Sequence, residues 1–164
     1  MKTIVPRPMN RQEFEKFGDV IDFDRPPDFA INKGMCDRYH GLSNSEATGE
    51  DAGIIISLGR AKPRSLPLNL EMMERHPLGS QAFIPLGKKT MLVVVAEDRN
   101  GTPAEPIAFL TMAGQGVNYR RNTWHAVLSP LDGTTDFVIV DREGPGDNLE
   151  EYFFKVPYLI TDAG

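Results

Sequence analysis

The chain has little of what forms disulfide bonds or spans a bilayer: cysteine is rare and the apolar runs are short. It contains a single cysteine, Cys36, so no disulfide can form within it, and a reducing compartment follows as the simplest setting. The longest apolar runs, 54–58 and 91–96, are far too short to span a membrane. The first residues also lack the apolar stretch of a signal peptide. We therefore expect a cytoplasmic protein without membrane contact.

Positive charge is also in short supply. Lysine and arginine number 18 against 23 acidic residues, which gives a formal net charge of −5. Binding of nucleic acid needs a basic surface, so we expect no nucleic acid partner. A local group of arginines can still bind a small anion, so the composition points to a small molecule as the partner.

Helical patterns are scarce as well. Residues 11–17 form the one convincing helix, with Asn10 and Glu13 at capping-box spacing and Gly18 as a stop. Elsewhere short strands alternate with glycine-rich and Asn/Asp-rich turns, and the strands are expected over 19–23, 38–42, 53–60, 69–75, 80–85, 91–97, 106–112, 116–119, 124–128, 137–141 and 151–156. This spacing predicts one all-β domain over residues 1–164, a sandwich or barrel with one or two short helices. Segments 43–52 and 144–148 are expected to be mobile surface loops.

Two blocks far apart in the chain collect polar side chains. Block 71–86 holds His76, and block 114–125 holds His125 and the only tryptophan, Trp124. On a strand ending near residue 76, Glu74 and His76 share one face, because side chains alternate. Alternation sends Arg75 to the opposite face, and it places Gln81 and Phe83 together on the next strand. We expect the two blocks to line one barrel cavity.

The spacing of these polar residues resembles that of the cupin family. The first cupin motif falls on Glu74, His76 and Gln81, and the second ends on His125. The resemblance implies a cupin-like β-barrel or jelly roll. It also implies that Glu74, His76, Gln81 and His125 occupy the positions that bind metal in metal-dependent cupins. Two imidazoles with a carboxylate suit a first-row divalent ion.

Longer blocks resemble the ureidoglycolate lyase family. They are residues 17–21, 31–34, 38–40, 74–85, 114–119, 121–125 and 135–142, in order over almost the whole chain. This resemblance implies a homodimer that releases urea and glyoxylate from (S)-ureidoglycolate during allantoin breakdown, with nickel as the metal. Family members often carry histidine where this chain has Arg120 and Ala126. His125 is thus the single imidazole of the second block.

The chemistry of urea elimination suits the side chains of these blocks. The reaction needs a base for the carbinol proton, an acid or metal for the developing charge, and a cation for the carboxylate. We expect His125, His76 and Asp141 to be catalytic, and the substrate to be bound by Arg38, His40, Gln81, Phe83, Tyr119 and Trp124. Either a metal is held by the cupin positions, or the pocket is metal-free and His76 and His125 act as acid and base.

Two other functions are compatible with a cupin-like barrel. The first is a different cupin enzyme, such as a metal-dependent oxygenase or an isomerase. Oxygenases usually bind iron through two histidines and a carboxylate, and here Gln81 stands in the usual carboxylate position. The second is a non-catalytic sensor of a small carboxylate, because a barrel by itself fixes no function.

Overall fold

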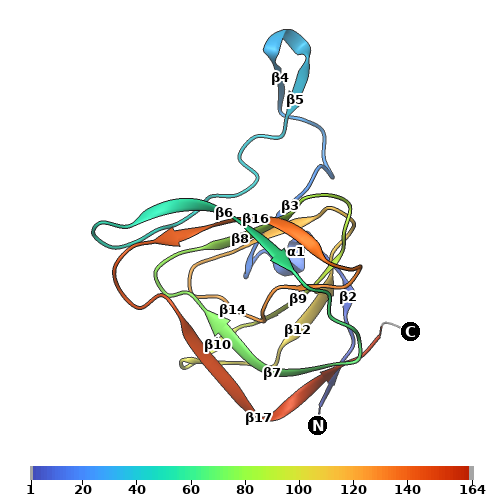
Figure 1. Ribbon diagram of the computed structural model, residues 1–164, viewed down its shortest axis with the longest axis vertical. Coiled ribbons are helices and arrows are strands. Elements are labelled where there is room, and N and C mark those ends of the chain that lie inside the picture. Colours follow the sequence, from blue (N-terminus) through green and yellow to red (C-terminus); the bar gives the residue numbers. More distant parts are fainter. Residues whose placement is uncertain (1, 163–164) are drawn as a thin grey trace.

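The structure, a computed structural model, describes residues 2–162 and consists almost entirely of β-strands (Figure 1). The larger sheet has eight strands in the order β1 (Thr3–Ile4), β17 (Glu150–Ile160), β7 (Leu68–Arg75), β14 (Trp124–His125), β9 (Met91–Ala96), β12 (Ile107–Leu110) and β2 (Arg7–Pro8), with β15 (Ser129–Pro130) also paired to β9. The smaller sheet has five, in the order β3 (Gly18–Ile21), β13 (Gly116–Tyr119), β8 (Gln81–Pro85), β16 (Thr135–Glu143) and β6 (Gly53–Ala61). The predicted all-β, cupin-like barrel is confirmed.

Two hairpins and two short helical segments complete the described chain. One hairpin pairs β4 (Phe29–Ile31) with β5 (Cys36–Arg38), and the other pairs β10 (Asp98–Arg99) with β11 (Thr102–Pro103). The helices are α1 (Arg11–Phe14) and the 3-10 turn η1 (Asn32–Gly34). None of the helices in residues 2–162 is long and apolar enough to cross a membrane.

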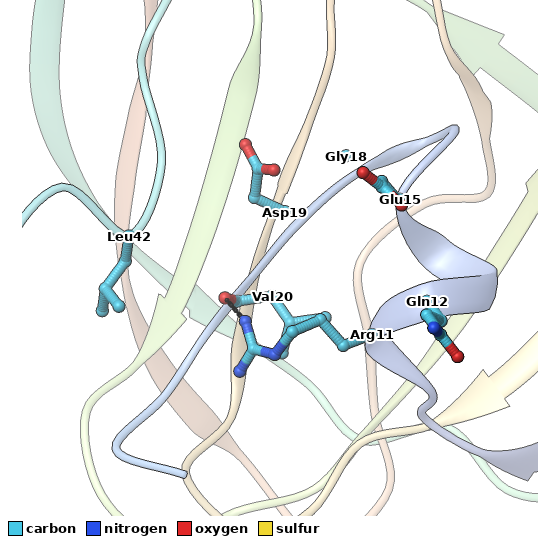
Figure 2. Close-up of a pocket in the computed structure, with 7 residues that line it drawn as sticks. All are labelled: Arg11, Gln12, Glu15, Gly18, Asp19, Val20 and Leu42. Carbon is cyan, nitrogen blue, oxygen red and sulfur yellow. Dashed lines mark hydrogen bonds between the residues drawn. The ribbon is translucent and has the colours of Figure 1, made fainter. Parts of the chain in front are cut away.

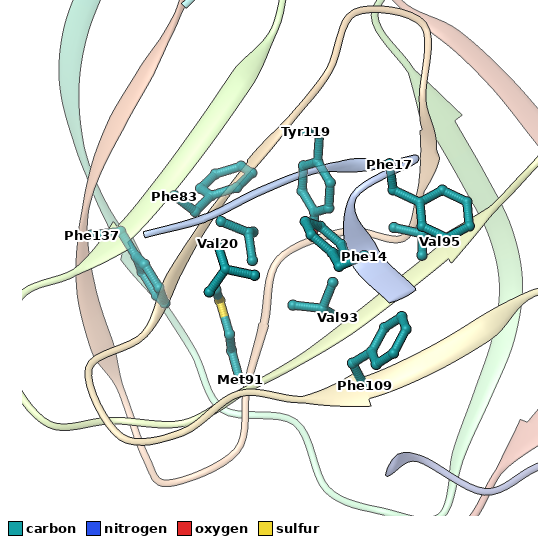
Figure 3. Close-up of a cluster of buried hydrophobic side chains, with 11 residues drawn as sticks. Phe14, Phe17, Val20, Phe83, Met91, Val93, Val95, Phe109, Tyr119 and Phe137 are labelled. Carbon is teal, nitrogen blue, oxygen red and sulfur yellow. The ribbon is translucent and has the colours of Figure 1, made fainter. Parts of the chain in front are cut away.

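The main core lies between the two sheets, and Figure 3 shows its side chains. Strand β9 is buried on both faces, so its residues alternate between two apolar clusters rather than between core and solvent. The inner cluster comprises Phe14, Phe17, Val20, Phe83, Met91, Val93, Val95, Phe109, Val117, Tyr119 and Phe137. Helix α1 closes one side of this core, where the Phe14 ring meets Phe109 edge-on at a centroid distance of 6.0 Å.

A second apolar cluster covers the outer face of the larger sheet. It contains Leu92, Val94 and Ala96 of β9 together with Trp124, and aromatic side chains of β17 pack against it. The Trp124 indole donates a hydrogen bond to Asp98 (2.9 Å), and the Arg75 guanidinium lies 4.5 Å from the ring centroid. Arg75 therefore faces outward, as side-chain alternation predicts.

The start of α1 follows the predicted cap only in part. The Asn10 side chain accepts a hydrogen bond from the Glu13 amide (3.0 Å), as expected. The Glu13 carboxylate does not complete the capping box; it forms an ion pair with Arg7. The helix ends at Phe14, three residues before the predicted end, and a turn from Phe14 carries Phe17 into the core.

Most expected strands are present with ends shifted by up to four residues, and two differ more strongly. The strand expected over 38–42 is instead β5, at 36–38, and it pairs in a hairpin that projects from the barrel (Figure 1). The strand expected over 124–128 is split into β14 and β15, because three residues of this chain lie opposite two of β9. Such an extra residue is a β-bulge, which interrupts the pairing without changing its direction.

Segment 43–50 runs over the outer face of the smaller sheet. The Asn118 amide donates to the Asn44 carbonyl (3.0 Å), and the Glu46 amide donates to the Ser80 hydroxyl (2.7 Å). The close approach requires glycine at 79, since a Cβ there would lie 2.6 Å from the Cβ of Arg142. The segment lies at the surface as predicted, and these hydrogen bonds attach it to the sheet; its mobility stays a prediction.

The position of Phe14 predicts a large cost for its removal. Phe14→Ala should lower the free energy of unfolding by about 3–5 kcal/mol, because a fully buried aromatic ring leaves a cavity. Urea denaturation followed by tryptophan fluorescence measures this change. Phe153→Ala is the control, because this ring is exposed, and it should cost less than about 1 kcal/mol. Equal losses in the two variants would contradict the assigned core.

Candidate active site

The two polar blocks meet at one end of the barrel. Glu74, the last residue but one of β7, lies opposite His125 of β14 in the antiparallel register, and His76 follows directly after β7. One ligand atom of each of these three side chains lies within 4.8 Å of the other two. The rings of His76 and His125 are 5.3 Å apart between centroids. The prediction that the two blocks come together is therefore confirmed for these three residues.

His125 is buried, and a hydrogen bond to the main chain fixes the orientation of its ring. Its Nδ1 lies 3.0 Å from the Ala126 carbonyl oxygen, which can only accept, so the hydrogen sits on Nδ1. Nε2 then carries a lone pair, and no group of residues 2–162 donates to it. Burial lowers the pKa of His125 to about 3, helped by the nearby His76 and opposed by the Ala126 carbonyl. The ring is thus neutral at pH 7 and free to bind a cation.

His76 directs its Nε2 to the same point. Its Nδ1 lies 2.7 Å from the Asn148 carbonyl oxygen, which places the hydrogen of the neutral ring on Nδ1. Its Nε2 then faces the Gln81 amide oxygen at 3.1 Å and a Glu74 oxygen at 3.9 Å. The Gln81 amide nitrogen is turned away and donates to Asp141 (3.2 Å). The acceptor atoms of Gln81 and Glu74 thus face His76 Nε2, and either a proton on this nitrogen or a cation between the three side chains satisfies them.

Tyr119 forms the inner wall of this group. Its ring stacks on His125 with a centroid distance of 4.2 Å and an interplanar angle of 2°. Burial and the Glu74 carboxylate raise the pKa of Tyr119, so the phenol stays protonated. Burial likewise raises the pKa of Glu74; His76 opposes this effect and Glu151 adds to it. The site is therefore largely desolvated, and a negative charge on Glu74 needs a nearby positive charge or hydrogen-bond donor to stabilise it.

The donor set fits a divalent metal ion. Two neutral imidazole nitrogens and one carboxylate oxygen are ligands that first-row divalent ions accept, and such ligands bind at about 2.0–2.2 Å. One ligand atom of each side chain lies within 4.8 Å of the other two, and His76 Nε2 lies 3.9 Å from a Glu74 oxygen, so small side-chain movements would bring all three onto one ion. The lone pair of the buried His125 Nε2, which has no partner within residues 2–162, is the strongest sign of this fit. The Gln81 amide oxygen is a further potential ligand.

The remaining predicted residues divide into two groups. Asp141 and Phe83 lie with the cluster: Asp141 sits opposite Gln81 in the β8–β16 register, and Phe83 contacts Tyr119 at a centroid distance of 6.3 Å. The structure does not bring Trp124, Arg38 and His40 to the cluster. Trp124 points to the outer face because its neighbour His125 points inward. Arg38 and His40 belong to the projecting hairpin and its return strand (Figure 1).

Arg120 and Ala126, the two positions where the family resemblance led us to expect histidine, also face away. Arg120 donates to Asp19 (3.5 Å) and to the Glu15 carbonyl, and Ala126 lies in the outer apolar cluster. Neither residue points toward Glu74, His76 and His125. Their identity in this chain therefore removes no imidazole from the cluster.

Sequence reasoning missed Asn148. Its carbonyl oxygen orients His76, and its side chain accepts from the Leu78 amide (2.8 Å), which joins the loop after β16 to the loop after β7. The only signal in the sequence is an asparagine next to Gly144-Pro-Gly146, which marks a turn. A contact made through a main-chain carbonyl leaves no side-chain signature.

A separate groove runs beside α1 (Figure 2). It is lined by Arg11, Gln12, Glu15, Gly18, Asp19, Val20 and Leu42. Arg11 donates a hydrogen bond to the Val20 carbonyl (2.8 Å) and forms an ion pair with Asp22 (2.6 Å). Its positive charge is therefore already neutralised by the protein itself. The groove contains two carboxylates, Glu15 and Asp19, but no imidazole, and Asp19 already accepts hydrogen bonds from Ser43 and Arg120. The cluster of Glu74, His76 and His125 therefore remains the candidate active site.

Comparisons with known proteins agree with this geometry. The sequence model described as ureidoglycolate lyase matches residues 1–161. The chain is 51% identical to the ureidoglycolate lyase of Chelativorans sp. (strain BNC1) over 160 residues, which are 98% of this chain and 97% of the relative. It is 53% identical to ureidoglycolate lyase 2 of Rhizobium meliloti (strain 1021), covering 96% of each.

The chain belongs to the ureidoglycolate lyase family. A third relative, the ureidoglycolate lyase of Agrobacterium fabrum, is 52% identical and covers 95% of this chain and 94% of the relative. Identity near one half over almost the full length favours the lyase over the oxygenase, isomerase and sensor alternatives. The resemblance found in the residue blocks is thereby confirmed.

The cluster predicts metal binding that depends on His125. Purified protein stripped with chelator should bind a divalent ion in equilibrium dialysis against Ni²⁺, Mn²⁺ or Zn²⁺. His125→Ala should weaken the binding by about a hundredfold or more, because it removes one of three strong ligands. His40→Ala is the matched control, since this imidazole lies on the hairpin and should leave the affinity unchanged. Equal affinities in both variants would exclude the cluster as the metal site.

Proposed function

We propose that this chain cleaves (S)-ureidoglycolate to glyoxylate and urea in allantoin catabolism. The observation that carries the proposal is the near-full-length identity of about one half to proteins named ureidoglycolate lyase. The geometry supports it, because the barrel end combines a metal-binding donor set with a separate carboxylate, Asp141.

The reaction is an elimination that changes no oxidation state overall. The carbinol hydroxyl loses its proton, and the oxygen electrons form the aldehyde C=O bond. The C–N bond breaks with its electron pair, and the departing urea nitrogen takes up a proton. One group that accepts the first proton and returns it to nitrogen is sufficient.

Glu74, His76 and His125 would hold the divalent ion, with Gln81 as a further oxygen ligand. We propose nickel, as the family resemblance implies. A bound ion supplies positive charge that stabilises the oxygens of an anionic substrate. In the metal-free alternative His76 and His125 act as acid and base. The lone pair of the buried His125, which meets no donor within residues 2–162, favours the ligand role.

Asp141 is the proposed proton carrier. Its carboxylate accepts a hydrogen bond from the Gln81 amide (3.2 Å), which orients it beside the cluster from the neighbouring strand. Asp141 takes the hydroxyl proton and delivers it to the leaving nitrogen. Tyr119 and Phe83 form the wall behind the histidine rings and exclude water from that side.

We also propose the setting in which the enzyme works. Residues 1–164 act as one cupin-like domain, the active form is a homodimer, and the compartment is the cytoplasm. A single cysteine, exposed and unpaired in the described structure, agrees with a reducing compartment. Exposed apolar side chains on the smaller sheet agree with a dimer.

The activity itself is tested with racemic ureidoglycolate. Purified protein should release glyoxylate and urea in equal amounts, well above the spontaneous rate. Chelation should abolish turnover, and added Ni²⁺ should restore it, because the carboxylate and imidazole donors need the ion. Release at only the spontaneous rate, with and without Ni²⁺, would refute the proposed function. Full activity after chelation would instead select the metal-free mechanism.

Asp141→Asn tests the proton carrier. The amide keeps the shape of the side chain but cannot accept the hydroxyl proton, so kcat should fall by about 10²–10⁴. Metal affinity should remain, since Asp141 is outside the group of Glu74, His76 and His125. The control is Asp136→Asn on the same strand, an exposed carboxylate paired with Arg60, which should keep normal kcat. Normal turnover in Asp141→Asn would remove this residue from the mechanism.

A further inference from the structure

Arg142 is a buried arginine without an acidic partner. The residue is only 8% exposed, and no carboxylate among residues 2–162 forms an ion pair with it. A buried charge is costly unless the protein replaces the hydrogen bonds that water would make. The groups that bind Arg142 therefore show what this charge holds in place.

Main-chain carbonyls of two loops surround the Arg142 guanidinium. Its Nε donates to the Thr48 carbonyl (2.8 Å), which belongs to the segment over the outer face of the smaller sheet. Its Nη1 donates to the Gly144 carbonyl (3.3 Å) and its Nη2 to the Pro145 carbonyl (2.6 Å), both in the loop between β16 and β17. One guanidinium thus joins two loops that are far apart in the sequence.

Glycine allows both loops to approach this side chain closely. Gly49 and Gly144 have φ angles of 100° and 155°, and a Cβ at either position would lie 3.2 Å from Nη2 of Arg142. Both loops are therefore shaped around the guanidinium, and larger residues at these positions would crowd it.

The loop that Arg142 holds also orients His76. At its end, the Asn148 carbonyl oxygen lies 2.7 Å from His76 Nδ1, and the Asn148 side chain accepts from the Leu78 amide (2.8 Å). Leu78 in turn binds the other loop, because its carbonyl accepts from both the amide and the hydroxyl of Thr48, each at 2.8 Å. A continuous set of hydrogen bonds therefore connects Arg142 to His76.

The tautomer of His76 depends on this connection. The Asn148 carbonyl can only accept, so it favours the hydrogen of the neutral ring on Nδ1. The Gln81 amide oxygen, 3.1 Å from Nε2, favours the hydrogen on the other nitrogen. The two acceptors compete for one hydrogen, and Asn148 has the advantage of the shorter contact only while its loop keeps the carbonyl in place.

We propose that Arg142 is a positioning residue for His76 and acts through loop 144–148. Its guanidinium fixes the first carbonyls of this loop and thereby the place of the Asn148 carbonyl, which keeps the hydrogen of His76 on Nδ1. Nε2 of His76 then stays available in the cluster, to a metal ion or to a proton.

Arg142 acts from behind the site rather than within it. Its neighbour Asp141 faces Gln81 and the cluster, so alternation places Arg142 on the outer face of β16. Loss of the guanidinium should therefore disturb His76 and leave His125 unchanged. This inference rests on the proposed function only for the role that His76 plays in the reaction.

The first test reads the tautomer of His76 by ¹⁵N NMR of metal-free protein, at a pH where the ring is neutral. Wild type should carry the hydrogen on Nδ1, whereas Arg142→Met should show both tautomers, because Gln81 then competes successfully. Arg60→Met is the matched control, since this exposed arginine pairs with Asp136 and should leave the spectrum of His76 unchanged. A pure Nδ1–H tautomer in folded Arg142→Met would overturn the proposal.

The second test measures the affinity for Ni²⁺ by equilibrium dialysis. Arg142→Met should weaken binding by about ten- to a hundredfold, as expected when the group that orients a ligating histidine is lost. Arg142→Lys keeps the buried charge but not the fork that reaches both loops, so its affinity and its tautomer ratio should be intermediate. Wild-type affinity in Arg142→Met would contradict the positioning role.

The lysine variant also guards against a failure to fold. If Arg142→Met does not fold, Arg142→Lys decides by the same two measurements, and wild-type values in both would overturn the proposal. Neither measurement depends on turnover. Wild type that releases no glyoxylate refutes the proposed function, whereas active wild type with an unchanged His76 tautomer in the Arg142 variants refutes only the positioning role.

Discussion

The antiparallel register between β7 and β14 is the constraint on which the site depends. It sets His125 opposite Glu74, and His76 then follows at the end of β7 with its ring beside His125. Because side chains alternate along a strand, a slip by one residue would turn Trp124 and Arg75 into the barrel and expose the imidazole. On the opposite face of the sheet the Arg75 guanidinium packs over the Trp124 ring, and both side chains also bind Asp98. These contacts stabilise the same register.

The same register explains why the cluster is both buried and chemically free. Each histidine donates its Nδ1 hydrogen to a main-chain carbonyl, that of Ala126 or of Asn148, and so directs its Nε2 into the cluster. For His125, this Nε2 meets no donor among residues 2–162. Tyr119 shields one side of the His125 ring from water. Desolvation keeps His125 neutral, and neutral imidazole is the form that binds a metal ion. The barrel therefore prepares the ligands before any ion arrives.

Much of this could be predicted from the sequence, since period-two alternation directly reports which face a residue occupies. Alternation put Glu74 and His76 on one face of a strand and Gln81 on the next, and His125 was expected in the opposite wall; the structure brings these four residues together. The two-residue strands β1 and β2 escaped prediction because long-range pairing with β17 and β12, not local pattern, creates them. The two-residue strands β10 and β11 form a local hairpin, of which only the turn at 98–101 was predicted. Trp124, Arg38 and His40 were expected at the pocket on the strength of similarity between blocks. Similarity between sequence blocks does not reveal to which face of a strand a side chain points, or whether the residue lies in the barrel or in the projecting hairpin.

The hydrogen bond from His125 to the Ala126 carbonyl affects which residues position 126 can tolerate. An orienting contact made by the main chain is available whatever side chain the next residue carries, provided that the side chain fits the outer apolar cluster. Position 126 can therefore drift between small and larger residues while the imidazole keeps its tautomer. Tolerance at the residue beside a key histidine thus follows from backbone geometry, and variability there says little about the importance of its neighbour.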